Sequence, residues 1–357
     1  MRFKEIILEI KDIFTPYSQR VFLVGGSVRD MILKKEIKDL DFEVFDMKEQ
    51  KFKSIMGKIG AVGVGESFFV YKYKGCDISL PRTEKKIAVG HRGFEVEICN
   101  DLKTASKRRD FTMNALMYNI FDETLEDFWG GESDIKDKII KIIDEKTFKE
   151  DSLRVLRAMQ FSSRFAMRID KKSLEIMQNI PLDDLTGERV FMEFQKMFNS
   201  ANLHYGLFYF LKLEISKKLF NFELSTTEFI KKALELQKNR EKFVKEFYPL
   251  YFIYIVNPKM VENLKAPRLY HKMMQKQIFF KDIDDKNLYL LSLKYPIKEW
   301  LGNYQKDVIL RAKKFNIFEK KFDHIKPKEV IDDGFEGKDI GIELEERLKK
   351  EIDSMPI

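Results

Sequence analysis

Cysteine and histidine are scarce in this sequence. Its 357 residues include two cysteines, Cys76 and Cys99, and four scattered histidines. Two cysteines cannot form the disulfide framework of a small secreted protein, and no Cys-x-x-Cys or paired-histidine spacing is present to bind zinc. The histidines also give no sign of a His-Asp phosphohydrolase site. These absences favour a cytoplasmic protein whose chemistry depends on other side chains.

Long apolar runs are also missing. The most apolar stretch, residues 247–256, has the length of a buried helix rather than of a membrane span. The N-terminal sequence MRFKEIILEI carries Glu5 and Glu9 within its apolar run and lacks a small-residue cleavage site, so we expect no signal peptide. We therefore expect no membrane partner.

The composition is typical of a soluble globular protein, with 44% hydrophobic and 34% charged residues. A chain of this length predicts two or more domains. The net charge of +7 comes from 65 basic and 58 acidic residues. Such an excess permits nucleic-acid binding without requiring it, because phosphate contacts need a clustered basic face rather than a large total charge.

Predicted strands are concentrated before residue 128, and helical periodicity dominates after Gly130 and Gly131. We therefore place a domain boundary at this glycine pair. The polar, glycine-flanked segment 81–93 is expected to be a long mobile loop. The expected strands are residues 21–24, 41–45, 61–64, 68–73, 76–80 and 94–98.

The first candidate site is the glycine pair in VFLVGGSVRD, which follows an apolar strand. Glycines at a strand end let backbone N–H groups approach a ligand, and a following helix, expected over residues 31–35, favours negative charge at its start. Residues Gly25 to Ser27 are thus expected to hold phosphates. A third glycine and a Gly-Lys-Ser/Thr sequence are both missing, which excludes a Rossmann fingerprint and a Walker loop. A glycine pair alone is more often a simple turn.

Two carboxylates, Asp39 and Asp41, follow on the next expected strand. Residues two apart on a strand face the same side, so both can bind one Mg²⁺, which prefers oxygen ligands. Asp77, on another expected strand, is the best candidate for a third carboxylate. An Asp-x-Asp pair alone is more often a solvated strand end, but phosphate binding and paired carboxylates in one unit suggest nucleotidyl transfer.

The sequence KRRDFTMN, residues 107–114, forms the second cluster. Arginine suits phosphate and ribose oxygens because its planar fork presents several fixed donors. The alternative is an ordinary solvated helix start with Asp110 near its N-cap.

The third cluster is EDSLRVLRAMQFSSR, residues 150–164, where Asp151, Arg154 and Arg157 share roughly one helix face. Cytosine and adenine both present an exocyclic amine beside an acceptor nitrogen, so one carboxylate and one arginine can hydrogen-bond either base. Uracil and guanine present a carbonyl instead of that amine. The alternative is a surface salt bridge worth little stability.

Two further helical patterns have mainly structural interpretations. In GERVFMEFQK, Arg189 and Glu193 have the spacing of an intrahelical ion pair. Residues 306–321 mix basic and apolar side chains, which predicts an amphipathic surface helix or, alternatively, a face that binds RNA phosphates.

The motifs GGSVRD, DLD, RRDFTMNA, EDSLRVLRA and GERVFMEF occur in this order within residues 20–200. In order and spacing the sequence resembles the class II tRNA nucleotidyltransferase family, which includes CCA-adding enzymes and bacterial poly(A) polymerases. The resemblance implies an α+β nucleotidyltransferase head with a polymerase-β-like mixed sheet, followed by an all-α neck, body and tail. The implied domains are a head over 1–131, a neck with the base-selecting helix over 132–200, a body over 201–270 and a tRNA-binding tail over 271–357.

The resemblance also implies roles for individual residues. Asp39 and Asp41 would bind the catalytic Mg²⁺, with Asp77 assisting in catalysis. The first nucleotide-binding group, at the triphosphate and ribose, comprises Gly25, Gly26, Ser27, Arg29, Asp30, Arg108, Arg109, Asp110 and Asn114. The second, at the base, comprises Asp151 and Arg154, supported by Glu150 and Arg157.

By this resemblance the protein would add CCA to the 3′ end of tRNA from CTP and ATP and release pyrophosphate, without an implied protein partner. The complete segment 81–93 favours full CCA addition or A addition. The alternatives are an A-adding enzyme acting on tRNA that ends in CC, and a poly(A) polymerase. A non-catalytic RNA-binding protein is a further alternative, against which the paired Asp39 and Asp41 argue.

Overall fold

The computed structural model describes residues 2–65, 69–86, 94–223, 226–242, 247–280 and 283–356. The chain divides into two compact units. Unit 1 comprises Met1–Thr186 and Lys212–Leu219, and unit 2 comprises Gly187–Leu211 and Phe220–Ile357. Each unit is described by itself.

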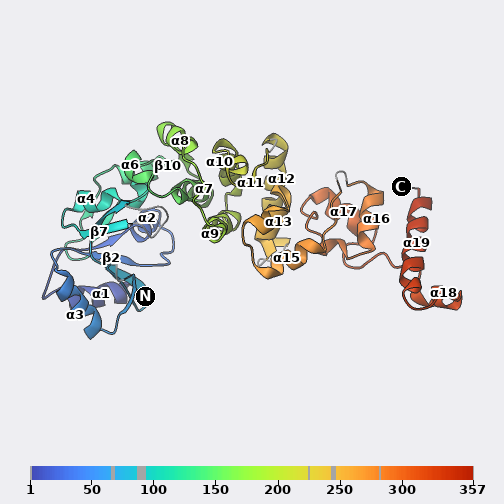
Figure 1. Ribbon diagram of the computed structural model, residues 1–357, viewed down its shortest axis with the longest axis horizontal. Helices are drawn as coiled ribbons and strands as arrows, with labels where there is room; N and C mark the ends of the chain where they lie inside the picture. The colour runs from blue at the N-terminus through green and yellow to red at the C-terminus, as the bar shows by residue number, and fades with distance from the viewer. Residues whose placement is uncertain are drawn as a thin grey trace. The chain divides into compact units, whose positions relative to one another are not determined.

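Unit 1, whose strand β2 is labelled in Figure 1, is built on a seven-stranded mixed sheet with the order β3-β4-β5-β2-β1-β8-β9. The pair β2 and β5 is parallel, and the other neighbouring strands are antiparallel. The strands are β1 Val21–Val24, β2 Asp41–Val44, β3 Val62–Gly65, β4 Val70–Tyr73, β5 Cys76–Ser79, β8 Met117–Asn119 and β9 Leu125–Glu126.

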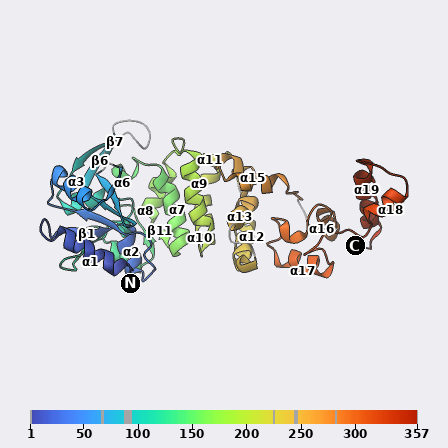
Figure 2. The ribbon, with the colours of Figure 1, turned by 90° about the horizontal axis from the view of Figure 1, so that it is seen from below.

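The core of this sheet forms where the sequence is most apolar. All four residues of β1 are buried, as expected for a central strand that is covered on both faces. Helix α1, Arg2–Phe14, lies beside the sheet (Figure 2) and buries Ile6, Ile10 and Phe14. The amphipathic spacing of these three side chains explains why this segment is a helix that packs on one face.

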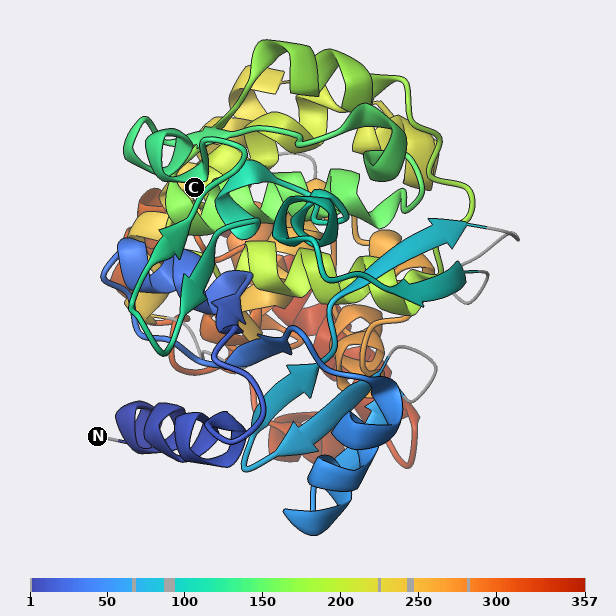
Figure 3. The ribbon, with the colours of Figure 1, turned by 90° about the vertical axis from the view of Figure 1, so that its left-hand side faces the viewer.

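The remaining elements of unit 1 are helices and two small strand pairs. The helices are α2 Gly26–Ile32, α3 Glu49–Lys58, α4 Leu102–Lys107, α5 Gly131–Lys136, α6 Glu145–Phe148, α7 Leu153–Phe165, α8 Lys171–Gln178 and α11 Ile215–Phe220. A parallel pair joins β10 Ile139–Ile140 to β11 Arg168–Ile169. An antiparallel ribbon, apart from the main sheet in Figure 3, joins β6 Arg82–Lys86 to β7 Phe94–Ile98.

The structure corrects three expectations for these elements. The loop expected over 81–93 contains strand β6, whose pairing with the alternating sequence of β7 overrides its charged composition; residues 87–93 lie outside the described residues. The helix expected over 31–35 begins at Gly26 and ends at Ile32. The segment expected to be all-α after the head contains the short β10–β11 pair.

The Gly130 and Gly131 pair starts helix α5 within unit 1. Gly130 has φ +75°, and a Cβ on Gly131 would collide with the carbonyl of Thr112, so both positions favour glycine. The carboxylate of Asp127 accepts hydrogen bonds from the backbone N–H groups of Gly131 and Glu132, which caps the helix.

Among the residues that the structure describes, unit 2 contains helices and connecting segments but no strand. The apolar helix α13, Tyr248–Val256, is buried on nearly all sides, as its sequence predicts, and Phe252 stacks on Phe198 with ring centroids 5.4 Å apart. The helices are α9 Gly187–Phe198, α10 Leu203–Lys212, α12 Thr226–Lys238, α13, α14 Met260–Asn263, α15 Arg268–Gln275, α16 Asp285–Ser292, α17 Lys306–Lys314, α18 Pro327–Asp332 and α19 Asp339–Ser354, with short 3₁₀ helices η3 Arg240–Lys242 and η5 Ile297–Glu299.

Helices α9 and α17 of unit 2 correspond to the two helical patterns that the sequence predicts to be mainly structural. In α9, Glu193 is buried and forms an intrahelical ion pair, with Lys196 at 2.7 Å. The amphipathic helix expected over 306–321 is found only over Lys306–Lys314 as α17, which buries Val308, Ile309 and Ala312. Across the described ranges, no helix combines the length and the apolar character needed to cross a lipid bilayer.

Candidate active site

The turn between β1 and α2 is where the separate sequence motifs meet. Gly25 has φ +69°, a left-handed conformation that favours glycine. A Cβ at this position would lie 3.2 Å from a guanidinium nitrogen of Arg109 and 3.7 Å from Oδ2 of Asp41. The absence of a side chain therefore lets the arginine and the carboxylate approach the backbone. The glycine turn, the Asp-x-Asp motif and the arginine pair form one site.

The register of the sheet places the second and third predicted carboxylates, Asp41 and Asp77, side by side. Asp41 on β2 is paired with Asp77 on the parallel strand β5. Asp39 is exposed and precedes β2, which begins at Asp41, so the two carboxylates of the motif do not share a strand as expected. Asp39 still acts electrostatically on Asp41, as Asp77 does. Lys72 lies 3.7 Å from Asp77 and partly balances its charge.

Asp41 is held in conditions that disfavour its negative charge. Burial raises the pKa of the Asp41 carboxyl; the guanidinium of Arg109 opposes this rise, while the charges of Asp77, Asp39 and Glu43 add to it. A cation between the carboxylates would relieve this repulsion. Carboxylate oxygens are the donor type that hard divalent cations prefer.

The donor set therefore fits a divalent metal of the kind that polymerase-β-type transferases use. In the described part of the chain, no three acidic, histidine or cysteine side chains converge closely enough to enclose an ion by themselves. That arrangement suits an ion that takes its other ligands from substrate phosphates and water.

A buried glutamate holds the arginine pair. Glu43, on β2 two residues after Asp41, is 1% exposed. Its Oε1 accepts hydrogen bonds from Arg108 at 2.6 Å and from Arg109 at 2.7 Å. Burial alone would raise the pKa of Glu43, but the two guanidinium groups outweigh it and the pKa is lowered. The sequence interpretation missed this residue, although an acidic residue inside an otherwise apolar strand was a usable signal.

Asp110 is the centre of a second buried network. Its Oδ2 accepts a hydrogen bond from Nε of Arg157 at 2.6 Å, and its Oδ1 accepts one from Nδ2 of Asn114 at 2.8 Å. Burial would raise the pKa of Asp110, but Arg157 and Asn114 outweigh it, so the pKa is lowered. Asp110 thus joins the arginine cluster to helix α7, rather than acting as a solvated helix cap.

The side chain of Arg29 lies inside this network. Its Nε donates to Asp30 at 2.8 Å, its Nη1 donates to Asn114 at 2.7 Å, and it is 4% exposed. The guanidinium also lies over the ring of Phe165, 4.5 Å from the centroid. The structure therefore turns the Arg29 side chain into the protein, where it positions its neighbours. Any phosphate contact at this position in this arrangement would come from the backbone.

The predicted base-reading residues lie at the start of α7. The helix begins at Leu153, so Asp151 precedes it and does not share a helix face with Arg154 as expected; Oδ1 of Asp151 accepts a hydrogen bond from the backbone of Leu153. The guanidinium of Arg154 donates to the carbonyl oxygens of Thr147 at 2.7 Å and Arg108 at 2.8 Å. Glu150 is partly buried just before this turn. Arg154 therefore links the helix start to the arginine pair.

The family model described as poly A polymerase head domain matches residues 21–141, the segment that contains the sheet and both arginines. The match contains the glycine turn, Asp39, Asp41 and Asp77 of the candidate site. The predicted base-reading residues at the start of α7 lie beyond the matched head domain.

Curated relatives of this head domain carry related names. A CCA-adding enzyme of Buchnera aphidicola subsp. Cinara cedri is 36% identical over 194 residues, which is 52% of this chain and 46% of that protein. A multifunctional CCA protein of Psychromonas ingrahamii is 36% identical over 189 residues, 49% of this chain and 44% of that protein. The chain thus spans about half the length of the curated relatives it matches. These matches confirm the family resemblance seen in the motifs.

Solved structures share the fold along the chain. The Thermotoga maritima CCA-adding enzyme complexed with tRNA_CCA has a TM-score of 0.68 at 20% identity, covering 100% of this chain and 92% of that one. A CCA-adding enzyme in complex with CTP has the same TM-score at 21% identity, also over 100% and 92% of the two chains. The mixed-sheet head followed by a mostly helical remainder, as predicted, is thereby confirmed.

Proposed function

We propose that this protein adds C, C and A to the 3′ end of tRNA from CTP and ATP and releases pyrophosphate. The observation that carries the proposal is that Asp41 and Arg109 both lie close to Gly25, at the turn between β1 and α2. The names of the relatives support it, as do solved structures with this fold described as complexes with CTP, ATP and tRNA_CCA.

The carboxylates are proposed to form the metal site, with Mg²⁺ as the ion. Asp39 and Asp41 would be its ligands, and Asp77 would assist from the neighbouring strand. The bound ion would lower the pKa of the attacking 3′-hydroxyl and balance charge on the leaving pyrophosphate. Asp41, whose charge is disfavoured in the protein alone, gains the most from such an ion.

The glycine turn and the arginines are proposed to hold the rest of the nucleotide. Backbone N–H groups of Gly25, Gly26 and Ser27 would bind the triphosphate, with Arg29 contributing through its backbone. Arg108 and Arg109, aligned by Glu43, would bind phosphate and ribose oxygens. Support for this set comes from the buried residues Asp30, Asp110 and Asn114 and from the partly buried Glu150 and Arg157.

Asp151 and Arg154 are proposed to select the base. The carboxylate would accept a hydrogen bond from the exocyclic amine that cytosine and adenine share, and the arginine would donate to the adjacent ring nitrogen. Arg154 already binds the carbonyl of Arg108, so the base reader and the ribose side of the site would move together.

For the chain as a whole, we propose a head over 1–131, a neck over 132–200, a body over 201–270 and a tRNA-binding tail over 271–357. We also propose that the protein acts in the cytoplasm, which its free cysteines support.

The test offers the purified protein three tRNA transcripts, lacking CCA, ending in C and ending in CC, each with one labelled NTP. CCA addition predicts C on the first two and A on the third. Addition of A only to the CC end would identify an A-adding enzyme. Long A tails on unrelated RNA would identify a poly(A) polymerase. No incorporation with any acceptor would refute nucleotidyl transfer.

A further inference from the structure

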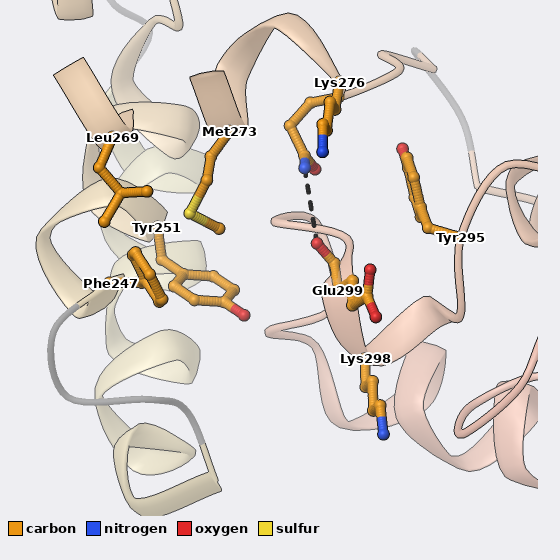
Figure 4. A pocket seen from close by; sticks show the side chains of 9 residues that line it. Phe247, Tyr251, Leu269, Met273, Lys276, Tyr295, Lys298 and Glu299 are labelled. Atoms are coloured by element: carbon orange, nitrogen blue, oxygen red, sulfur yellow. Dashed lines mark hydrogen bonds between the residues drawn. The ribbon is translucent and has the colours of Figure 1, made fainter. Parts of the chain in front are cut away.

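Unit 2 contains a pocket that has no part in the candidate active site. Its volume is about 350 Å³, which falls within the range of roughly 300–1,000 Å³ usual for ligand pockets. Figure 4 shows Tyr295 and Glu299 on one side and Phe247, Tyr251 and Met273 on the other. The lining is mainly aromatic and apolar, with a few polar groups, and comprises Phe247, Tyr251, Leu269, Met273, Lys276, Gln277, Tyr295, Lys298 and Glu299.

Hydrogen bonds hold the walls of this pocket in place. Oε1 of Gln277 accepts a hydrogen bond from the backbone of Leu301 at 2.8 Å, and its Nε2 donates to the carbonyl of Glu299 at 3.5 Å, the dashed line in Figure 4. The hydroxyl of Tyr295 accepts from the backbone of Ile278 at 3.1 Å. These hydrogen bonds connect the two walls of the pocket, so the pocket is formed before a ligand binds.

Helix α15 carries a basic stripe along the edge of the pocket. Arg268 and Lys272 on α15, and Lys276 at its C-cap, recur every fourth residue and are exposed, so they follow one side of the helix. Their neighbours Leu269 and Met273 line the pocket. Helix α15 contains no acidic residue. Nothing among the described residues forms an ion pair with these three cations.

We propose that the pocket takes one unstacked nucleobase of the bound RNA, with the neighbouring phosphates along the basic stripe. The inference rests on the proposed function, because it gives tRNA a second contact site. Aromatic rings bind bases of any sequence by stacking, and lysine and arginine bind the backbone. The carboxylate of Glu299 can accept a hydrogen bond from a base N–H. An apolar peptide would fill the pocket equally well, but would leave the stripe of three cations without a partner.

The first test places a negative charge in the pocket. Leu269 is 42% exposed and Leu8, on helix α1 of the head, is 60% exposed, so Leu269→Asp and Leu8→Asp are matched substitutions on helix surfaces. Affinity for a fluorescent tRNA transcript lacking CCA is measured by anisotropy at fixed salt. We expect Leu269→Asp to weaken binding about tenfold, the effect of losing one stacked base, and Leu8→Asp to match the wild type. Thermal unfolding checks that both variants fold.

The second test addresses the stripe. Each phosphate contact contributes about one unit to the slope of log affinity against log salt, so Lys272→Ala should reduce the slope by about one. Lys53→Ala, which removes an exposed lysine on α3 already paired with Glu49, should leave the slope unchanged. Ultraviolet crosslinking of wild-type protein to the transcript should attach RNA to peptides containing Tyr251, Met273 or Tyr295.

The outcomes separate this inference from the function on which it rests. If the wild type binds and extends tRNA but Leu269→Asp binds it equally well, the pocket proposal is wrong and its occupant is not RNA. Crosslinks confined to other peptides would have the same meaning. If the wild type binds no tRNA, both proposals fall.

Discussion

At the scale of single residues, two acidic side chains on one strand have opposite energetic roles. Glu43 is buried between two arginines that lower its pKa, so its charge stabilises the fold. Asp41, two residues earlier, has a raised pKa because burial and neighbouring carboxylates disfavour its charge. A residue whose charge is costly in the protein alone is a candidate for ligand binding, whereas one whose charge is compensated is a candidate for positioning.

Substituting Glu43 should destabilise the protein and disturb the nucleotide site. Glu43→Gln leaves two arginines beside a neutral side chain, and breaking a buried ion pair from one side costs about 3 kcal/mol. We expect a lower free energy of urea unfolding and a higher KM for NTP. Glu49→Gln, which breaks an exposed pair with Lys53, should change stability by less than about 0.5 kcal/mol. Equal losses in the two variants would contradict the positioning role.

Substituting Asp41 should separate activity from stability. Asp41→Asn removes a charge that the folded protein disfavours, so we expect the free energy of unfolding to stay within about 0.5 kcal/mol of wild type or to rise. Incorporation of CMP and AMP should fall by at least about 100-fold. Asp46→Asn, at an exposed ion pair beyond the end of β2, is the control and should retain activity. Near-normal rates in Asp41→Asn would refute the metal assignment.

At the scale of elements, strands with an apolar or alternating sequence were predictable, including the edge strand β3, whereas β6, β8 and β9 were not. The apolar run of β1 and the alternation in β7 have clear local signals, and both strands are found. Strand β6, RTEKK, has no apolar residue to mark it, because its stability comes from pairing with β7. The pairing of Asp41 with Asp77 also depends on sheet register, which no local pattern specifies.

The start of α7 illustrates the same limit for the site. The spacing of Asp151 and Arg154 predicted a shared helix face, but the helix starts at Leu153. Arg154 instead reaches the carbonyl of Arg108, 46 residues away in the sequence. Contacts between such distant segments follow from packing, and the sequence pattern alone could not supply them.

Helix α7 should control base selection. Arg154→Ala removes a donor proposed to read the ring nitrogen of cytosine and adenine, so the preference for CTP over UTP should fall by about 10-fold to 100-fold in kcat/KM. Affinity for tRNA should change much less. Arg168→Ala, an exposed arginine on β11, serves as the control. Unchanged CTP-over-UTP selectivity in Arg154→Ala would refute the base-reader assignment.

At the scale of the whole molecule, each unit has its own core and its own tryptophan. Trp129 lies in unit 1 and donates a hydrogen bond to Ser106, and Trp300 lies in unit 2. Fluorescence of Trp129 in a Trp300→Phe background therefore reports unfolding of unit 1 alone. This separation matters because a chain with two units need not unfold in one step.

Within unit 1, the ion pair between Asp110 and Arg157 should make stability depend on pH. The pKa of Asp110 is lowered in the folded state, so its contribution is fully present above the ordinary aspartate pKa of about 3.9 and is lost as the pH falls through the lowered value. Asp110→Asn cannot make this contribution at any pH. Followed by Trp129 fluorescence in urea, the difference in unfolding free energy between the parent and Asp110→Asn should be constant from pH 7 to pH 5 and shrink below about pH 4. A difference that stayed constant down to pH 2.5 would show that Asp110 stabilises the fold through its shape and hydrogen bonds rather than through its charge.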